Sequence, residues 1–293
     1  MRVEVIGVPS DEGAPLAGAR MGPAALRCAG LHRAVRAAGH ELADLGDVAL
    51  PPGPVQAPGP GRLPAVTGAC RAVAAAVEAS HRRGALPLVL GGDHSLAAGS
   101  VLGGRRAGRG AGLIWLDAHG DFNTPGTSPT GNLHGMPLAA LVLGGVAGFG
   151  EAAGAAVQAG CAVLLGVRSL DAGERCALLR SGLTVLTMED IERQGICALT
   201  ARALAVATAG GRRPFHLSWD LDVLDPEIAP GVGTPVPGGL TFREARCALE
   251  GMAASGLLCA LDVVELNPAL DVRNRTAELA VELIGAVLQR CAV

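Results

Sequence analysis

The sequence predicts an α/β protein with a mainly parallel sheet and helices on both of its faces. Short runs rich in valine, isoleucine and leucine alternate along the chain with longer alanine- and leucine-rich stretches of helical length. The short runs are apolar at nearly every position, as expected of strands that are buried on both faces. Such alternation is typical of a parallel sheet between two layers of helices. No break in composition divides the chain, so we expect residues 1–293 to form a single domain.

The first third of the chain contains two predicted strands and two predicted helices. Residues 3–8 form a strand that a proline ends, and residues 23–38 form a helix with a proline near its first turn. Residues 51–61 are rich in proline and glycine, which predicts a surface loop. A long amphipathic helix is expected at 63–83, and a strand at 86–90 ends at two glycines.

The same alternation continues to the end of the chain. Further strands are expected at 113–116, 162–166, 183–186, 216–219 and 258–264. Further helices are expected at 174–180, 188–194, 200–209, 242–254 and 277–291. In a parallel sheet, ligands bind beyond the carboxyl ends of the strands, so the residues directly after each strand are the first candidates for a functional site.

Composition excludes several kinds of partner. The formal net charge of −3 leaves no basic field, so we expect no nucleic-acid partner. The longest apolar run, 136–149, is too short and too rich in glycine to span a membrane. The 8 cysteines are scattered and form no C-x-x-C pair, so we expect free thiols in a reducing cytoplasm.

Residues with the side chains of metal ligands follow four of the predicted strands. They are His94 after the strand at 86–90, Asp117, His119 and Asp121 after 113–116, Asp220 and Asp222 after 216–219, and Glu265 after 258–264. Each motif alone also has an ordinary structural interpretation, as a turn or a helix cap. Their joint occurrence at strand ends of one predicted sheet favours a metal site instead.

Spacing explains how these side chains can converge. In an extended segment, residues i, i+2 and i+4 point to one side, so Asp117, His119 and Asp121 can meet, and so can Asp220 and Asp222. Four carboxylates packed together repel one another unless cations neutralise them. Imidazole together with carboxylate suits Mn²⁺, with Co²⁺, Fe²⁺ or Ni²⁺ as alternatives. The set contains no cysteine, which argues against a structural zinc site.

Long motifs in a fixed order extend this pattern over nearly the whole chain. They are IGVP at 6–9, GPAALR at 22–27, GGDHS at 91–95, DAHGDFNTPGTSPTGNLHG at 117–135, SWDLDVLDP at 218–226, GTPVPGGLT at 233–241 and LDVVELNP at 261–268. On these motifs the chain resembles the ureohydrolases, and among them the arginases. The resemblance implies a three-layer α/β/α fold, two Mn²⁺ ions per subunit, and hydrolysis of the guanidinium of L-arginine to L-ornithine and urea.

The resemblance also implies a ligand set. One ion would be held by His94, Asp117, Asp121 and Asp220, and the other by His119, Asp117, Asp220 and Asp222, so that Asp117 and Asp220 bridge. Two cations can lower the pKa of a shared water from about 15.7 toward 7. We expect the resulting metal-bridging hydroxide to attack the guanidinium carbon.

Three further residues receive catalytic roles. Asp121 is expected to take a proton from the tetrahedral intermediate and to deliver it to the leaving amine. Glu265 is expected to position the guanidinium, although a carboxylate at a strand end can also cap a turn. By resemblance, His134 is a proton shuttle or general acid rather than a ligand, a task that suits the pKa of histidine.

The far end of the substrate is expected to meet two loops. Neutral donors for the α-carboxylate are Asn123, Ser128, Thr130 and Asn132. For the α-ammonium, Asp171 and the nearby Glu174 match the R-x-x-D-x-G-E stretch of the arginases, although Asp171 can also cap the following helix. Thr234 is expected to support Glu265 and the guanidinium through its hydroxyl.

Two alternatives to an arginase remain. A sister ureohydrolase that acts on agmatine or another guanidino compound shares the metal motifs and differs only in the substrate loops. A catalytically silent arginine-binding protein belongs to another class, but all six ligand positions and His134 are intact. The resemblance further implies a homo-oligomer, a trimer or hexamer.

Overall fold

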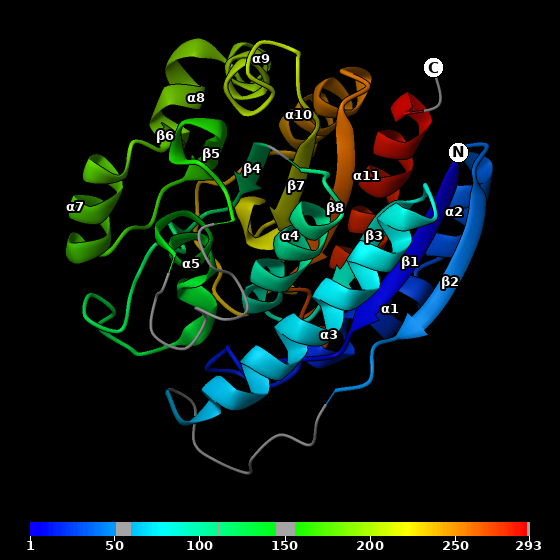
Figure 1. Cartoon of the computed structure of the whole chain (residues 1–293), viewed down its shortest axis with the longest axis horizontal. Helices are drawn as coiled ribbons and strands as arrows, with labels where there is room; N and C mark the ends of the chain where they lie inside the picture. Colours follow the sequence, from blue (N-terminus) through cyan, green and yellow to red (C-terminus); the bar gives the residue numbers. More distant parts are fainter. Residues whose placement is uncertain (51–59, 111, 145–155, 292–293) are drawn as a thin grey trace.

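The computed structural model describes residues 1–50, 60–110, 112–144 and 156–291, and one parallel sheet lies at its centre (Figure 1). The strands within these residues are β1 (Arg2–Val8), β2 (Glu41–Asp47), β3 (Leu86–Gly91), β4 (Gly112–Leu116), β5 (Ala162–Val167), β6 (Thr184–Thr187), β7 (Phe215–Asp220) and β8 (Leu258–Val264). Their order across the sheet is β2-β1-β3-β8-β7-β4-β5-β6, and every neighbouring pair is parallel. All carboxyl ends therefore lie at one edge of the sheet.

Helices cover both faces of this sheet, which confirms the predicted fold class (Figure 1). They are α1 (Gly22–Cys28), α2 (Leu31–Ala37), α3 (Leu63–Arg82), α4 (Ala97–Arg106), α5 (Pro137–Leu143), α7 (Ala172–Ser181), α8 (Met188–Gln194), α9 (Ile196–Ala207), α10 (Phe242–Ala254) and α11 (Arg275–Cys291). Helices α3, α4 and α5 pack on one face, and α1, α2 and α8 to α11 pack on the other. Strands β3, β4, β5 and β7 are buried along their whole length, as their continuous apolar pattern predicts.

Strand β2 and helices α4 and α5 were not predicted. Strand β2 forms the sheet edge beside β1. Most of its residues are exposed and three of the seven are acidic, so it lacks the apolar pattern of a buried strand. Helix α4 contains three glycines, which lower helix propensity. An added Cβ at Gly99 would collide with the backbone of Cys70 in α3. Glycine there permits close packing of the two helices, a reason that local propensity does not reveal.

The predicted helix at 23–38 is two helices. Gly30 lies between α1 and α2 with φ 98°, a left-handed conformation that glycine adopts without strain. The chain therefore turns between the two segments instead of continuing as one helix. Most of the predicted proline- and glycine-rich loop, at 51–59, lies outside the described residues.

The expectation that all cysteines are free thiols is wrong for one pair. Cys197 of α9 and Cys247 of α10 form a disulfide that joins two neighbouring helices. The two cysteines are 50 residues apart in sequence. Sequence spacing could not pair them because the two helices meet only after packing on the sheet.

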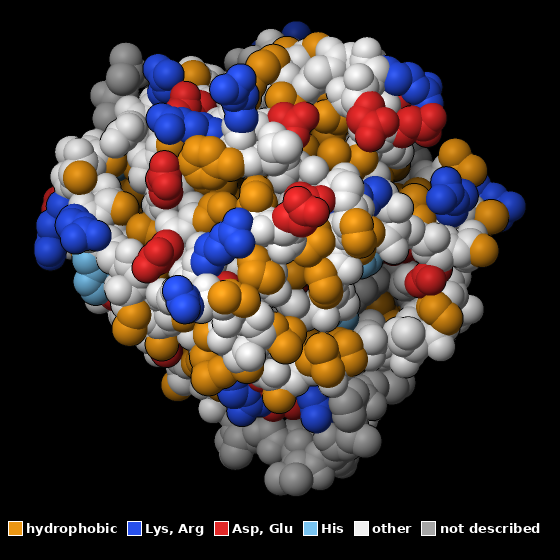
Figure 2. All heavy atoms as spheres, turned by 180° about the vertical axis from the view of Figure 1, so that it is seen from behind, with side chains coloured by type: hydrophobic (Ala, Val, Ile, Leu, Met, Phe, Trp, Pro, Cys, Tyr) orange, Lys and Arg blue, Asp and Glu red, His pale blue; other side chains and the backbone are white. Residues whose placement is uncertain are grey.

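Two features of the described residues concern the helices and the surface charge. In the described part of the chain, no helix has both the length and the apolarity needed to cross a membrane. Figure 2 shows basic and acidic side chains mixed on one face of the molecule, with apolar side chains between them.

Candidate metal centre

The carboxyl ends of four adjacent strands supply the side chains at the centre of the site. In the sheet order β3-β8-β7-β4, these ends are followed by His94, by Glu265, by the pair Asp220 and Asp222, and by the segment that begins at Asp117. Residues that are far apart in sequence therefore become neighbours. This arrangement is the one that the strand-end motifs predicted.

A first cluster surrounds His94. Its Nδ1 atom lies 3.0 Å from Asp117 Oδ2, 3.2 Å from Asp121 Oδ2 and 3.1 Å from Asp220 Oδ2. The imidazole is buried, and its Nε2 atom is 2.9 Å from the hydroxyl of Ser218. Nδ1 is thus left to face three carboxylate oxygens.

A second cluster adjoins the first through Asp117. His119 Nδ1 lies 2.9 Å from Asp222 Oδ2 and 3.6 Å from Asp117 Oδ1. Potential ligand atoms of His94, Asp117 and Asp220, and of Asp117, His119 and Asp222, lie within 4.8 Å of one another in each group. Asp117 belongs to both groups, one oxygen facing each histidine, whereas Asp220 belongs only to the first.

The pKa values of the four carboxyl groups indicate that the site carries more negative than positive charge. Burial and the carboxylates of Asp222 and Asp117 raise the pKa of Asp220 well above its ordinary value. Burial and the charge of Asp117 raise the pKa of Asp121 to about 6, and burial and Asp117 also raise that of Asp222. Burial acts in the same direction on Asp117, but His119 and His94 hold the pKa of this carboxyl far below its ordinary value.

Two buried polar atoms that lack hydrogen-bond partners indicate that a cation fits this site. His94 Nδ1 and Asp121 Oδ2 are buried and have no well-aligned hydrogen-bond partner among the described residues, although they are only 3.2 Å apart. A buried polar atom without a partner is costly, and a cation shared by these atoms would satisfy both. The donors are imidazole nitrogen and carboxylate oxygen, which suit Mn²⁺ and its neighbours in the first transition series.

Beside the clusters, the partly buried His134 pairs with the buried Glu265. His134 Nδ1 lies 2.9 Å from Glu265 Oε1, and the same oxygen accepts a hydrogen bond of 2.8 Å from the backbone N–H of His94. Burial alone would lower the pKa of His134, but the carboxylates of Glu265, Asp121 and Asp93 raise it to about 9. The imidazole is therefore a cation at neutral pH and can donate a proton.

Two of the residues with predicted catalytic roles have strained backbones. Asp121 has φ 49° and Glu265 has φ 66°, both in the left-handed region that residues other than glycine rarely adopt. Such strain persists only where the surroundings enforce it, and it is concentrated at functional sites.

A pocket of about 170 Å³ opens above the clusters, and all the predicted substrate residues except Glu265 line it. Its lining includes His119, Asp121, Asn123, Ser128, Thr130, Asn132, His134, Asp171, Glu174, Asp220, Asp222 and Thr234. The two loops expected to bind the α-groups therefore face the same cavity as the clusters. Glu265 is not among its lining residues.

Glu174 lies under the loop that carries Asp121. Its Oε1 accepts a hydrogen bond of 2.8 Å from the backbone N–H of Phe122. An added Cβ at Gly120 would meet the Glu174 carboxylate at 2.5–2.6 Å, so glycine is required for this close approach. Burial and the charges of Asp121 and Asp171 raise the pKa of Glu174 to about 7.

Three side chains have structural contacts that refine their predicted roles. Thr234 donates its hydroxyl hydrogen bond to Asp222 Oδ2 at 3.1 Å rather than to Glu265, and its support of the guanidinium stays a prediction. Asp171 is the N-cap of α7 and forms a capping box with Glu174, while its Oδ2 accepts from Asn123 Nδ2 at 2.9 Å. Asp93 caps the short helix that contains His94, because it accepts a hydrogen bond from the backbone N–H of Ser95 at 3.0 Å.

Three residues that surround the proposed ligands and restrain them were not predicted from the sequence. Trp115 and Ser218 both contact His94. The guanidinium of Arg168 donates to five backbone carbonyls, those of Asp222, Val223, Leu224, Val236 and Pro237, at 2.6–3.3 Å. It thereby ties the Asp222 segment to the loop that carries Thr234. Ser218 and Arg168 lie within the motifs SWDLDVLDP and R-x-x-D-x-G-E, but the motifs do not reveal these contacts, because the partners come from other strands and loops.

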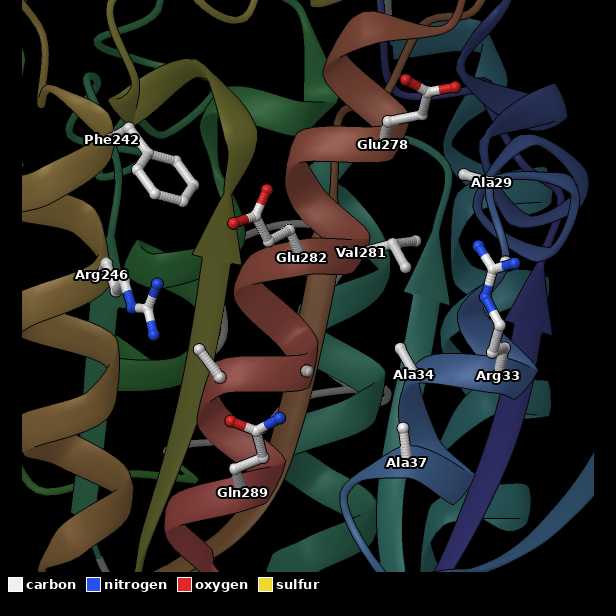
Figure 3. A pocket seen from close by; sticks show the side chains of 13 residues that line it. Ala29, Arg33, Ala34, Ala37, Phe242, Arg246, Glu278, Val281, Glu282 and Gln289 are labelled. Atoms are coloured by element: carbon white, nitrogen blue, oxygen red, sulfur yellow. The ribbon is translucent and has the colours of Figure 1, made fainter.

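A larger groove, of about 600 Å³, lies elsewhere, among α2, α10 and α11 (Figure 3). Arg33, Arg246, Glu278 and Glu282 stand around it, between small apolar side chains. None of the predicted ligands or substrate residues lines this groove. Its opposite charges lie on separate helices and form no group that resembles the His–Asp clusters.

Comparisons with known proteins agree with this geometry. A family model described as "Arginase family" matches residues 1–289. The chain is 42% identical to the arginase of Bacillus caldovelox across 97% of each chain. It is 43% identical to the arginase of Brucella melitensis across 99% of this chain and 97% of the relative. A native structure of the Bacillus caldovelox arginase superposes with a TM-score of 0.92 at 41% identity, across 98% of each chain.

Proposed function

The chain belongs to the arginase family, and from this premise we propose that it hydrolyses the guanidinium of L-arginine to L-ornithine and urea at the site described above. One observation carries this proposal most directly. Two His–carboxylate clusters, buried except for the partly exposed His119, share Asp117 beneath a pocket that two polar loops line. The enzyme class that this supports is a hydrolase acting on a linear amidine.

The proposed cofactor is a pair of Mn²⁺ ions per subunit, with Co²⁺, Fe²⁺ or Ni²⁺ as alternatives. His94, Asp117, Asp121 and Asp220 would hold one ion, and His119, Asp117, Asp220 and Asp222 the other. The clusters support Asp117 as a bridge, since its Oδ2 faces His94 and its Oδ1 faces His119. The chemistry that such a pair supplies when bound is activation of water, whose pKa it lowers toward 7.

Side chains of the protein would then bind the cationic substrate and transfer protons. Asp121 lies beside His94 at the proposed ion site, and it would accept a proton from the tetrahedral intermediate and return it to the leaving amine. Glu265 would pair with the guanidinium, and His134, held 2.9 Å from Glu265, would deliver a second proton. Both carboxylates are buried, which strengthens their interaction with a cationic substrate.

The far end of the pocket supports recognition of an α-amino acid. Asn123, Ser128, Thr130 and Asn132 offer neutral donors for a carboxylate, and Asp171 with Glu174 offers negative charge for an ammonium group. Agmatine lacks the α-carboxylate, so it would leave the neutral donors without their partner. A site built around a polar substrate group discriminates against analogues that lack it.

A substrate panel tests the proposal. Purified protein would be freed of metal, reconstituted with Mn²⁺, and assayed for urea release from L-arginine, agmatine and 4-guanidinobutyrate. We expect kcat/KM for arginine to exceed that for agmatine by at least about 10³. Equal efficiency on both would move the protein to another ureohydrolase activity. No urea from any of the three in the presence of Mn²⁺ would favour a silent arginine-binding protein.

Oligomeric state and location remain predictions. The family resemblance implies a homo-oligomer, a trimer or hexamer, which size-exclusion chromatography with light scattering measures. A cytoplasmic location is predicted from the scattered cysteines and the short apolar runs, and fractionation of the source cells tests it.

A further inference from the structure

Trp115 is a buried aromatic residue at the centre of the sheet that none of the proposed roles uses. It lies on β4, two positions before Asp117, and its side chain is fully buried. Since side chains two apart on a strand point to the same side, the indole lies directly beneath the metal clusters.

The indole contacts two proposed ligands at once. Its Nε1 donates a hydrogen bond of 3.0 Å to Asp117 Oδ2. Its ring stacks on the imidazole of His94, with ring centroids 4.0 Å apart and an interplanar angle of 11°. Indole nitrogen can only donate, and a donor to a carboxylate makes a strong, charge-assisted hydrogen bond. One rigid side chain thus restrains both the rotation of a carboxylate and the plane of an imidazole.

The two oxygens of Asp117 have different neighbours, which makes this contact selective. Oδ2 receives the indole N–H and lies 3.0 Å from His94 Nδ1. Oδ1 instead accepts the backbone N–H of His119 at 2.7 Å and lies 3.6 Å from His119 Nδ1. The contacts of Trp115 therefore fall on the His94 side of the centre.

We propose that Trp115 is a positioning residue that preorganises the cation site formed by His94, Asp117 and Asp220, and that it sets the affinity of this site without setting that of the His119 site. The proposal rests on the binuclear metal centre proposed above. Ser218 completes the restraint, because its hydroxyl is 2.9 Å from His94 Nε2, at the other end of the imidazole. Groups that orient metal ligands typically change metal affinity by about 10- to 100-fold when they are removed.

The chain offers a matched control in Trp219. This residue lies on β7, directly before Asp220, and is as fully buried as Trp115. Its indole nitrogen, however, has no hydrogen-bond partner among the described residues. Trp219→Phe therefore removes the same atoms from the core on the opposite face of the sheet, without removing a donor from a proposed ligand.

The test measures Mn²⁺ binding to Trp115→Phe, Trp219→Phe and the unaltered protein. Each protein would be stripped with a chelator, dialysed against a series of free Mn²⁺ concentrations, and analysed for bound metal by atomic emission. Electron paramagnetic resonance would distinguish coupled pairs from single ions. We expect Trp115→Phe to keep one ion but to need about 10- to 100-fold more Mn²⁺ for the second, so that single ions replace coupled pairs at intermediate concentrations. Trp219→Phe should bind two ions as the unaltered protein does.

Three results would overturn the proposal. One is identical binding by Trp115→Phe and Trp219→Phe, and another is equal weakening of both ions in Trp115→Phe. The third is absence of Mn²⁺ binding by the unaltered protein, which would refute the metal centre itself and is thus distinguishable from the first two. If Trp115→Phe does not fold, Ser218→Ala provides the second variant, because it frees the other end of His94 and should weaken the same single ion.

Discussion

Replacement of His134 by asparagine separates proton delivery from metal binding. The imidazole lies outside both clusters, and its Nδ1 pairs with Glu265 Oε1 at 2.9 Å. Asparagine preserves a polar side chain of similar size but cannot carry a proton. His134→Asn should therefore retain its bound metal and lose turnover.

The size of this loss of turnover depends on the protonation state of His134. With its pKa raised to about 9, His134 is protonated in nearly all molecules at neutral pH, so the general acid is present at full strength. General acid–base catalysis by one positioned group contributes about 10²- to 10⁴-fold. At about 1.36 kcal/mol per factor of ten, this corresponds to roughly 3–5 kcal/mol of the activation barrier. We expect kcat to fall by that factor.

The pH dependence gives a second measure. The folded-state pKa of His134 lies above the ordinary value of 6.5, so the stabilisation from its pair with Glu265 is complete below about pH 6.5 and is lost as pH rises through about 9. Turnover of the unaltered protein should rise from neutral toward alkaline pH, as activated water becomes available, and fall above about pH 9 as His134 loses its proton. The fall should be absent in His134→Asn.

Urea release would be followed from pH 6.5 to 10.5 with Mn²⁺ in excess, with bound metal measured by atomic emission at each pH. Loss of metal in His134→Asn would show that the residue is a ligand after all. Unchanged turnover, or a high-pH fall that persists in the variant, would refute its role as the acid.

Three further predictions concern the centre and its support. Asp220→Ala should lose bound metal and activity together, because the residue lies in the His94 cluster, and two ions that still bind tightly by atomic emission would contradict its assignment. Arg168→Met leaves five backbone carbonyls without their donor, so the midpoint of thermal unfolding should fall by about 5 °C or more and KM for arginine should rise. Unchanged values would mean that other contacts hold the loops. Reduction of the Cys197–Cys247 disulfide should lower the free energy of unfolding by about 2–4 kcal/mol, since it closes a loop between residues 50 apart, and Cys197→Ser should be insensitive to the reductant.

Most of the sheet could be predicted because its strands are buried on both faces. Strand β8 and helices α8 and α10 have the predicted bounds, since apolar runs and capping residues mark their ends. Strand β2 and helix α4 could not be predicted in the same way. The first is stabilised by its edge pairing with β1, and the second by close packing on α3, and both are tertiary effects.

The sequence by itself determined the residue types of the candidate centre and their place after the strands, because parallel strands bring their carboxyl ends to one edge whatever connects them. Only the tertiary structure decided which strands are neighbours. The sheet order β3-β8-β7-β4 places segments from residues 94, 265, 220 and 117 side by side. It also decided which atoms meet: Oδ2 of Asp117 with His94 and Trp115, Oδ1 with His119, and Thr234 with Asp222 rather than Glu265. Hydrogen bonds and stacking act over a few ångströms, and those distances are set by packing between distant segments, which no local pattern in the chain records.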